Sequence, residues 1–147
     1  MTLPLSRFLL LLTTIGASSA CKPIHTNNEI ESAMKRYDYF LQKVDADSIA
    51  SLFTIDGDLG KQAHGRAAIK NFLSQYKDIN VLSQKSTTLS IEIAGDAATQ
   101  KGTYKQSDIL PSSKDTLNVS GTFTTDWIWD QYAGWLIKSI EAKPDRQ

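Results

Sequence analysis

The fold is decided by residues 45–76, which read DADSIASLFTIDGDLGKQAHGRAAIKNFLSQY. Apolar residues recur at three- and four-residue spacing within 49–53 and again within 69–76, as on the buried face of a helix. The residues between these two sets are rich in Gly and Asp, which favour turns. The segment therefore predicts two helices, separated by a short ribbon of antiparallel strands that turns at Asp56-Gly57.

Residues 1–20 have the pattern of a secretory signal peptide. One basic residue, Arg7, precedes an apolar run over 8–15, and small residues follow. The run is too short to cross a membrane, which takes about 20 apolar residues. It matches instead the apolar region that an export machine reads before the segment is removed. The only cysteine, Cys21, comes directly after it.

Cys21 has two alternative fates. The run Ser18-Ser19-Ala20-Cys21 resembles the lipobox of bacterial lipoproteins, in which the cysteine is diacylated and becomes the new N-terminus. Ordinary cleavage after Ala20 would leave a free thiol, which exported proteins usually avoid because it invites intermolecular disulfides. We expect lipidation, which would anchor the protein to the membrane at the periplasmic face of a bacterial cell envelope. The alternative is a soluble periplasmic or secreted protein.

Length and charge favour one ordinary globular domain. We divide the exported chain into a short tether, 21–28, and a domain, 29–147, which is long enough for one sizeable core. The whole chain has 16 basic and 16 acidic side chains and no basic stripe, so nothing favours nucleic acid as a partner. A single cysteine allows no internal disulfide, so the core has to hold the domain.

Periodicity predicts helices first and strands afterwards. Apolar residues recur with helical spacing from Ile30 to Val44, with Asn28 as the expected N-cap. After the helix that follows Gly65, apolar and polar residues alternate, as in half-buried strands. Four strands are expected, over 88–93, 98–104, 117–130 and 135–140. This order predicts an α+β fold, with three helices packed on one face of a curved antiparallel sheet.

Several short motifs give the chain a resemblance to a known superfamily. They are Arg36-Tyr37, DSIASLFTID at 47–56, HGRAAI at 64–69, IAGDA at 93–97, and Trp127 followed by Gly134-Trp135. In order and spacing they resemble the nuclear transport factor 2-like superfamily, in its SnoaL-like and ketosteroid isomerase-like branch. The resemblance covers nearly all of 29–139. It implies a cone-shaped sheet closed by helices around an apolar cavity, often in a homodimer.

The isomerase branch implies a tyrosine in the first helix, an aspartate base in the ribbon and a protonated aspartate in a later strand. Tyr37 falls on the tyrosine position. The base position falls on Lys61, and a lysine amine is ordinarily protonated at neutral pH. The third position falls near Gly102 or Tyr104, where no carboxylate stands. The resemblance therefore implies the cavity without the general base of that isomerase.

Three residues are candidates for catalysis, each with a structural alternative. Tyr37 lies on the apolar face of its helix, where it either packs in the core or donates a hydrogen bond. His64, the only histidine in 29–147, either acts as an acid or base or bonds the backbone before a helix. Asp126 either points inward or faces solvent. The expected ligand pocket comprises Tyr37, Phe53, Lys61, His64, Gln100, Tyr104 and Trp127.

Three functions follow from these observations. The leading hypothesis is noncatalytic binding of a small apolar or amphipathic molecule in the cone cavity, with no cofactor and no metal. The first alternative is an enzyme that transfers protons on a carbonyl compound through Tyr37 and His64, or Asp126. The second alternative is a homodimeric interaction module with its tryptophans in the interface.

Overall fold

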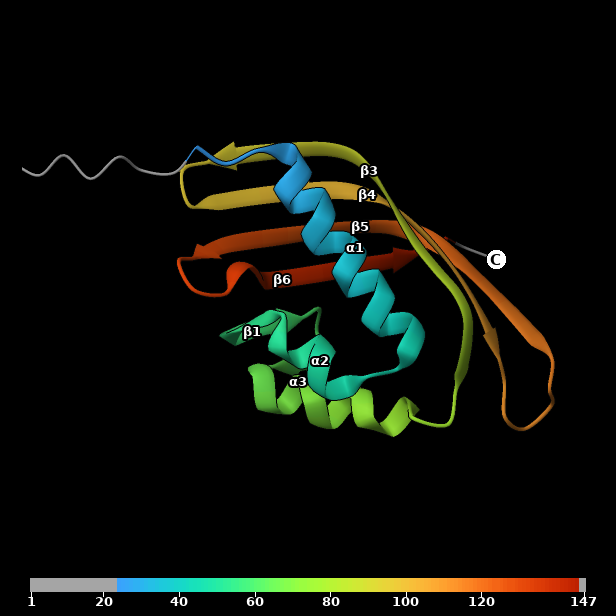
Figure 1. The fold of residues 1–147 in the computed structure, drawn as a ribbon. Coiled ribbons are helices and arrows are strands. Elements are labelled where there is room, and N and C mark those ends of the chain that lie inside the picture. Colours follow the sequence, from blue (N-terminus) through green and yellow to red (C-terminus); the bar gives the residue numbers. More distant parts are fainter. Residues whose placement is uncertain (1–23, 146–147) are drawn as a thin grey trace, which may run out of the picture.

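Three helices are followed by a long curved sheet in the computed structural model, which describes residues 24–145 (Figure 1). The helices are α1 (Asn27–Lys43), α2 (Ala46–Ser51) and α3 (Arg66–Leu73), which continues into a 3-10 turn, η1 (Ser74–Tyr76). The strands are β1 (Phe53–Leu59), β2 (Ala63–His64), β3 (Asn80–Ala94), β4 (Ala97–Ile109), β5 (Thr116–Asp130) and β6 (Gly134–Pro144). The predicted α+β class is confirmed.

Polar residues fix the starts of the first two helices. Thr26 is the N-cap of α1, two residues before the expected Asn28, and its backbone N–H donates to Glu29 Oε2 at 3.4 Å. Asp45 is the N-cap of α2, where its carboxylate accepts from the Ser48 backbone N–H at 3.0 Å. The carboxylates of Glu29 and Asp45 thus each accept from a backbone N–H that has no partner inside the helix. The start of α1 therefore depends on a residue within the predicted tether.

The ribbon differs from its prediction in the place of its turn. Asp56-Gly57 was expected to turn the chain, but both residues lie inside β1, and the turn occupies residues 60–62, with Gly60 at φ 51°. The reason is that β1 pairs not only with β2, in antiparallel, but also with β6, in parallel. This pairing brings the Gly57 backbone so close to β6 that a Cβ would lie 3.0 Å from the Ile137 carbonyl oxygen.

The sheet has the strand order β2-β1-β6-β5-β4-β3, and its long strands bend around α1 (Figure 1). The register shifts once between β5 and β6 and twice between β3 and β4, and such bulges increase strand bending. The predicted alternation holds along β5, whereas on β3 a register shift between Thr88 and Ser90 leaves Leu89 71% exposed, although its strand pattern had grouped it with Ile91 and Ile93. On β5, for example, Phe123, Thr125 and Trp127 are buried, whereas Thr122 and Asp126 are exposed.

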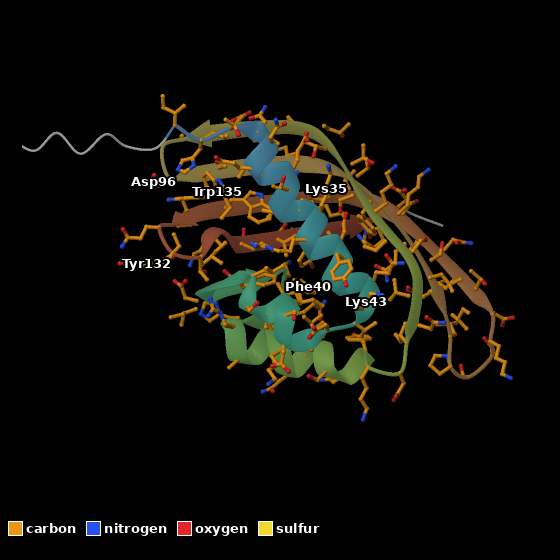
Figure 2. The ribbon with its side chains drawn as sticks, in the orientation of Figure 1. Lys35, Phe40, Lys43, Asp96, Tyr132 and Trp135 are labelled. Atoms are coloured by element: carbon orange, nitrogen blue, oxygen red, sulfur yellow. The ribbon has the colours of Figure 1, made fainter. Side chains whose placement is uncertain are left out.

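The core lies between α1 and the concave face of the sheet. From α1 it includes Ile30, Ala33, Met34 and Tyr37, which form the predicted apolar face. Trp127, Trp135 and Ile137 meet them from the sheet, and each is at most 3% exposed. The exposed side of α1 carries charge instead, as Lys35 and Lys43 illustrate (Figure 2). The buried residues of α1 are thus concentrated in its first three turns.

Candidate ligand-binding site

A cavity of about 270 Å³ lies between α1 and the inner face of the sheet. It begins where the tightly packed part of α1 ends, so Tyr37 stands between core and cavity. Its lining comprises Tyr37, Leu41, Gln84, Ser86, Tyr104, Gln106, Val119, Phe123, Ile140 and Ala142. The walls mix apolar with uncharged polar side chains, as in sites that bind small amphipathic molecules. We call this space the first cavity.

Asp38 fixes the polar edge of the first cavity. Its carboxylate accepts hydrogen bonds from Gln84 Nε2 at 3.1 Å, from Ser86 Oγ at 2.7 Å and from the Ser86 backbone N–H at 2.7 Å. These bonds join α1 to β3 and set the orientation of the Gln84 amide. In that orientation Gln84 Oε1 is buried and has no hydrogen-bond partner among the described residues.

Tyr37 contributes a hydroxyl group to the first cavity. The side chain is 7% exposed, and burial, with a smaller effect of the neighbouring Asp38 charge, raises the pKa of Tyr37 far above its ordinary value. The phenol is therefore a proton-bearing donor throughout the physiological range. Within residues 24–145 it forms no hydrogen bond. Across the cavity, burial and then the Asp145 charge raise the pKa of Tyr104, which also keeps its hydroxyl protonated.

A second cavity, of about 240 Å³, adjoins the first and shares Leu41 and Gln106 with it. Its lining comprises Leu41, Val44, Ile49, Leu73, Tyr76, Ile79, Val81, Gln106 and Asp108. Asp108 is 6% exposed, and its two carboxylate oxygens lie 2.8 and 2.9 Å from Gln106 Nε2. Sequence reasoning missed Asp108. Extending the alternation of 98–104 by four residues would have placed it on the inner face of β4.

Three of the predicted pocket residues, Phe53, Gln100 and Trp127, lie in the packed core. Phe53 is fully buried, and its ring makes an edge contact with Tyr37 at a centroid distance of 6.3 Å. Gln100 is also fully buried, donates from Nε2 to Thr88 Oγ1 at 2.8 Å and accepts from Trp127 Nε1 at 3.2 Å. These side chains support the cavity walls from behind without lining either cavity.

Three other predicted site residues lie away from both cavities. Lys61 is exposed in the turn between β1 and β2. The His64 side chain is 74% exposed and pairs with Asp58, Nδ1 to Oδ1, at 2.6 Å. Asp126 is exposed on the outer face of the sheet, where Thr99 Oγ1 and Ser139 Oγ donate to it at 2.8 and 2.9 Å. Of the three candidate catalytic residues, the structure places only Tyr37 at the cavity.

His25 is a buried residue that sequence reasoning left in the tether. Its side chain is 2% exposed, and its ring lies against Trp129 and Trp135, with centroid distances of 4.3 and 4.7 Å. Its Nδ1 lies 3.0 Å from Glu29 Oε2, and this hydrogen bond, followed by one from Trp135, lowers the pKa of Glu29. Figure 2 shows Trp135 and Asp96 at the end of the molecule where α1 begins.

The predicted lipidation site, Cys21, lies outside the described residues. Within 24–145, no group of three or more His, Cys, Asp or Glu side chains is placed to hold a metal ion. No helix in that same range is long and apolar enough to cross a membrane.

Solved structures with the same fold come from several bacteria. A nuclear transport factor 2-like superfamily protein from Salmonella enterica serovar Typhimurium is 15% identical, with a TM-score of 0.68 over 82% of this chain and 91% of that one. A ketosteroid isomerase-like protein from Erwinia carotovora atroseptica is 13% identical, with a TM-score of 0.70 over 82% and 96%. A Catenulispora acidiphila protein in complex with S-DNPA is 18% identical, with a TM-score of 0.68 over 80% and 92%.

At such identities these likenesses establish the fold alone. No curated protein matches the chain significantly. The sequence of residues 23–141 nevertheless matches the family described as SnoaL-like domain, which covers most of the chain. This match shows that the chain belongs to the SnoaL-like domain family, and its cone-shaped sheet has the fold of the nuclear transport factor 2-like protein from Salmonella.

Proposed function

We propose that this chain is an exported protein, anchored to a bacterial envelope membrane through lipidated Cys21, which binds a small apolar or amphipathic molecule in the first cavity. The observation that carries the binding proposal is Gln84 Oε1, a buried acceptor at the edge of an amphipathic cavity for which residues 24–145 provide no donor. Leaving such a group unpaired costs about 1–3 kcal/mol. A ligand that donates a hydrogen bond to it would recover part of that cost.

The hydroxyl of Tyr37 adds the complementary function. It is a donor, because the raised pKa of Tyr37 keeps the phenol protonated. A ligand with an acceptor near Tyr37 and a donor near Gln84 would satisfy both groups, while its apolar body contacts Val119 and Phe123. The Catenulispora acidiphila structure, in complex with S-DNPA, supports the idea that this fold can hold a small molecule.

Binding without catalysis is favoured over proton transfer by the placement of the candidate acids and bases. His64 and Asp126 are exposed and line neither cavity, so Tyr37 has no titratable partner from the predicted set beside it. The interaction-module alternative placed tryptophans in a dimer interface, but Trp127 and Trp135 are buried within the protomer. The homodimer itself stays part of the proposal, and analytical ultracentrifugation tests it.

Filling the first cavity tests the binding proposal. Val119→Trp would place a large ring at the cavity wall, whereas Thr122→Trp adds the same ring on the exposed side of the same strand. Envelope small-molecule extracts should raise the melting temperature of the unmodified protein and of Thr122→Trp, but not that of Val119→Trp. Native mass spectrometry would identify the bound mass. A screen in which no compound stabilises the unmodified protein would contradict the proposal.

A separate experiment tests the anchor. The full chain, expressed in a bacterium with its signal segment, should fractionate with membranes and carry the added mass of a diacylglyceryl group. Cys21→Ser should remove both properties. Unchanged membrane fractionation and mature mass in Cys21→Ser would show that Cys21 is not the site of attachment.

A further inference from the structure

The second cavity contains a carboxyl group without a charged partner. Asp108 lies on the inner face of β4, and the hydrogen bonds it accepts within residues 24–145 come from the neutral Gln106 amide. It is 6% exposed, although acidic side chains are rarely buried to this degree unless they are paired. Burying a carboxylate is unfavourable unless a cation or several donors surround it. Asp108 therefore has one neutral donor beside it and lacks the cation that usually accompanies a buried carboxylate.

The two cavities together lack a positive side chain. Among the described residues, no Lys, Arg or His lines either of them. A carboxylate-bearing ligand would thus meet Asp108 without a compensating charge, and like charges in a site of low polarity repel strongly. A ligand with a cationic group would instead supply what Asp108 lacks. The charge pattern selects against acids and in favour of amines.

Leu41 and Gln106 connect the second cavity to the first, because each lines both. Both are unbranched at Cβ and have several rotatable bonds, so they can change rotamer more readily than β-branched residues. Gln106 also holds Asp108 on one side, which leaves the remaining acceptor positions of the carboxylate for a second donor. An elongated molecule can therefore place its head group at Asp108 and its body past Leu41.

We propose that the second cavity binds the ammonium group of an amphipathic amine, with Asp108 as the anchoring residue and the apolar body of the ligand in the first cavity. This inference rests on the proposed binding function and names its ligand class. Gln106 is a positioning residue that orients the Asp108 carboxylate. Tyr37 and Gln84 then contact whatever polar groups the body of the amine carries.

Head-group selectivity tests the inference. Octylamine, octan-1-ol and octanoate share one chain length and differ in charge at pH 7, where a primary amine is protonated. Calorimetric titration would use the mature chain, residues 21–147, with Cys21→Ser to keep it free of lipid. Octylamine should bind at least about tenfold more tightly than octan-1-ol, because a charge-assisted hydrogen bond is stronger than a neutral one. Octanoate should bind most weakly.

Asp108→Asn keeps the size of the side chain and removes its charge, so it should abolish the preference for the amine while octan-1-ol binds as before. Asp115→Asn, the same substitution at an exposed loop position, should preserve the preference. Equal binding of octylamine and octan-1-ol by the protein that retains Asp108 would overturn the inference and leave the proposed binding function standing. This result does not depend on whether Asp108→Asn folds. Failure of all three probes to bind would count against both proposals.

Discussion

Two neighbouring buried polar residues should respond in opposite ways to the loss of their polar atoms. Gln100 on β4 and Thr125 on β5 are directly paired in register, and both are fully buried. Gln100 bonds to Thr88 and Trp127, whereas Thr125 Oγ1 has no partner among the described residues. Gln100→Met and Thr125→Val each approximately conserve volume, so the difference between them isolates hydrogen-bond satisfaction.

Magnitudes follow from what each substitution leaves behind. Gln100→Met leaves the buried Trp127 N–H without an acceptor, at a cost of about 1–3 kcal/mol. Thr88 is partly exposed, so its hydroxyl can bond to water instead. We expect a loss of about 2 kcal/mol. Thr125→Val removes a buried hydroxyl that has no partner to lose, so we expect no loss and a gain of up to about 1 kcal/mol.

Urea denaturation of both variants, followed by tryptophan fluorescence and circular dichroism, measures these changes as shifts in midpoint at constant slope. By the usual scaling for a domain of this size, about 2 kcal/mol corresponds to a fall in melting temperature of roughly 6–10 °C. Equal destabilisation by the two substitutions would refute the reasoning, because packing rather than polar satisfaction would then govern this layer of the core.

Three further predictions concern single residues. Because burial raises the pKa of Tyr37 above its unfolded value of 10.0, stability should fall as pH rises above 10, and Tyr37→Phe should flatten that part of a melting-temperature profile. Since hydrogen bonds from His25 and Trp135 lower the pKa of Glu29, its contribution should be lost as pH falls below 4.5, more steeply in the wild-type protein than in Glu29→Gln. Gly102→Ala should destabilise by about 3 kcal/mol in urea, because the new Cβ would overlap the Thr87 carbonyl and lie 2.7 Å from the Phe123 ring; a neutral effect would contradict this close packing.

Alternation was the pattern that predicted the sheet best, because side chains in a strand point to opposite faces with a fixed period of two residues. It separated Gln100 from its sequence neighbours on one strand, grouped Thr125 with Trp127 on another, and the structure buries all three. The ribbon was predicted less well, because its apolar side chain is exposed and its glycine is buried. Ile55 is 80% exposed while Gly57 is buried, since the contact that matters there is backbone against backbone.

Residues that act through distant partners could not be found from local sequence. His25 belongs to no periodic apolar pattern in the sequence, and its partners Trp129 and Trp135 lie more than a hundred residues away in the chain. Asp108 could have been predicted, because it continues the inner face of β4. Its significance depends on two cavities that only the fold brings together, and on their lining, which includes no Lys, Arg or His among the described residues.

Polar contacts hold the later part of α1, which borders the cavities, at a distance from the sheet. Its early apolar residues Ile30, Ala33, Met34 and Tyr37 are buried against the sheet. Beyond them, Asp38 bonds to β3, and Gln42 Nε2 donates to the Leu82 carbonyl at 3.0 Å. These bonds fix the spacing between helix and sheet without filling it. The hollow is therefore compatible with a stable core, and a ligand that fills it would add stability in proportion to its affinity and concentration.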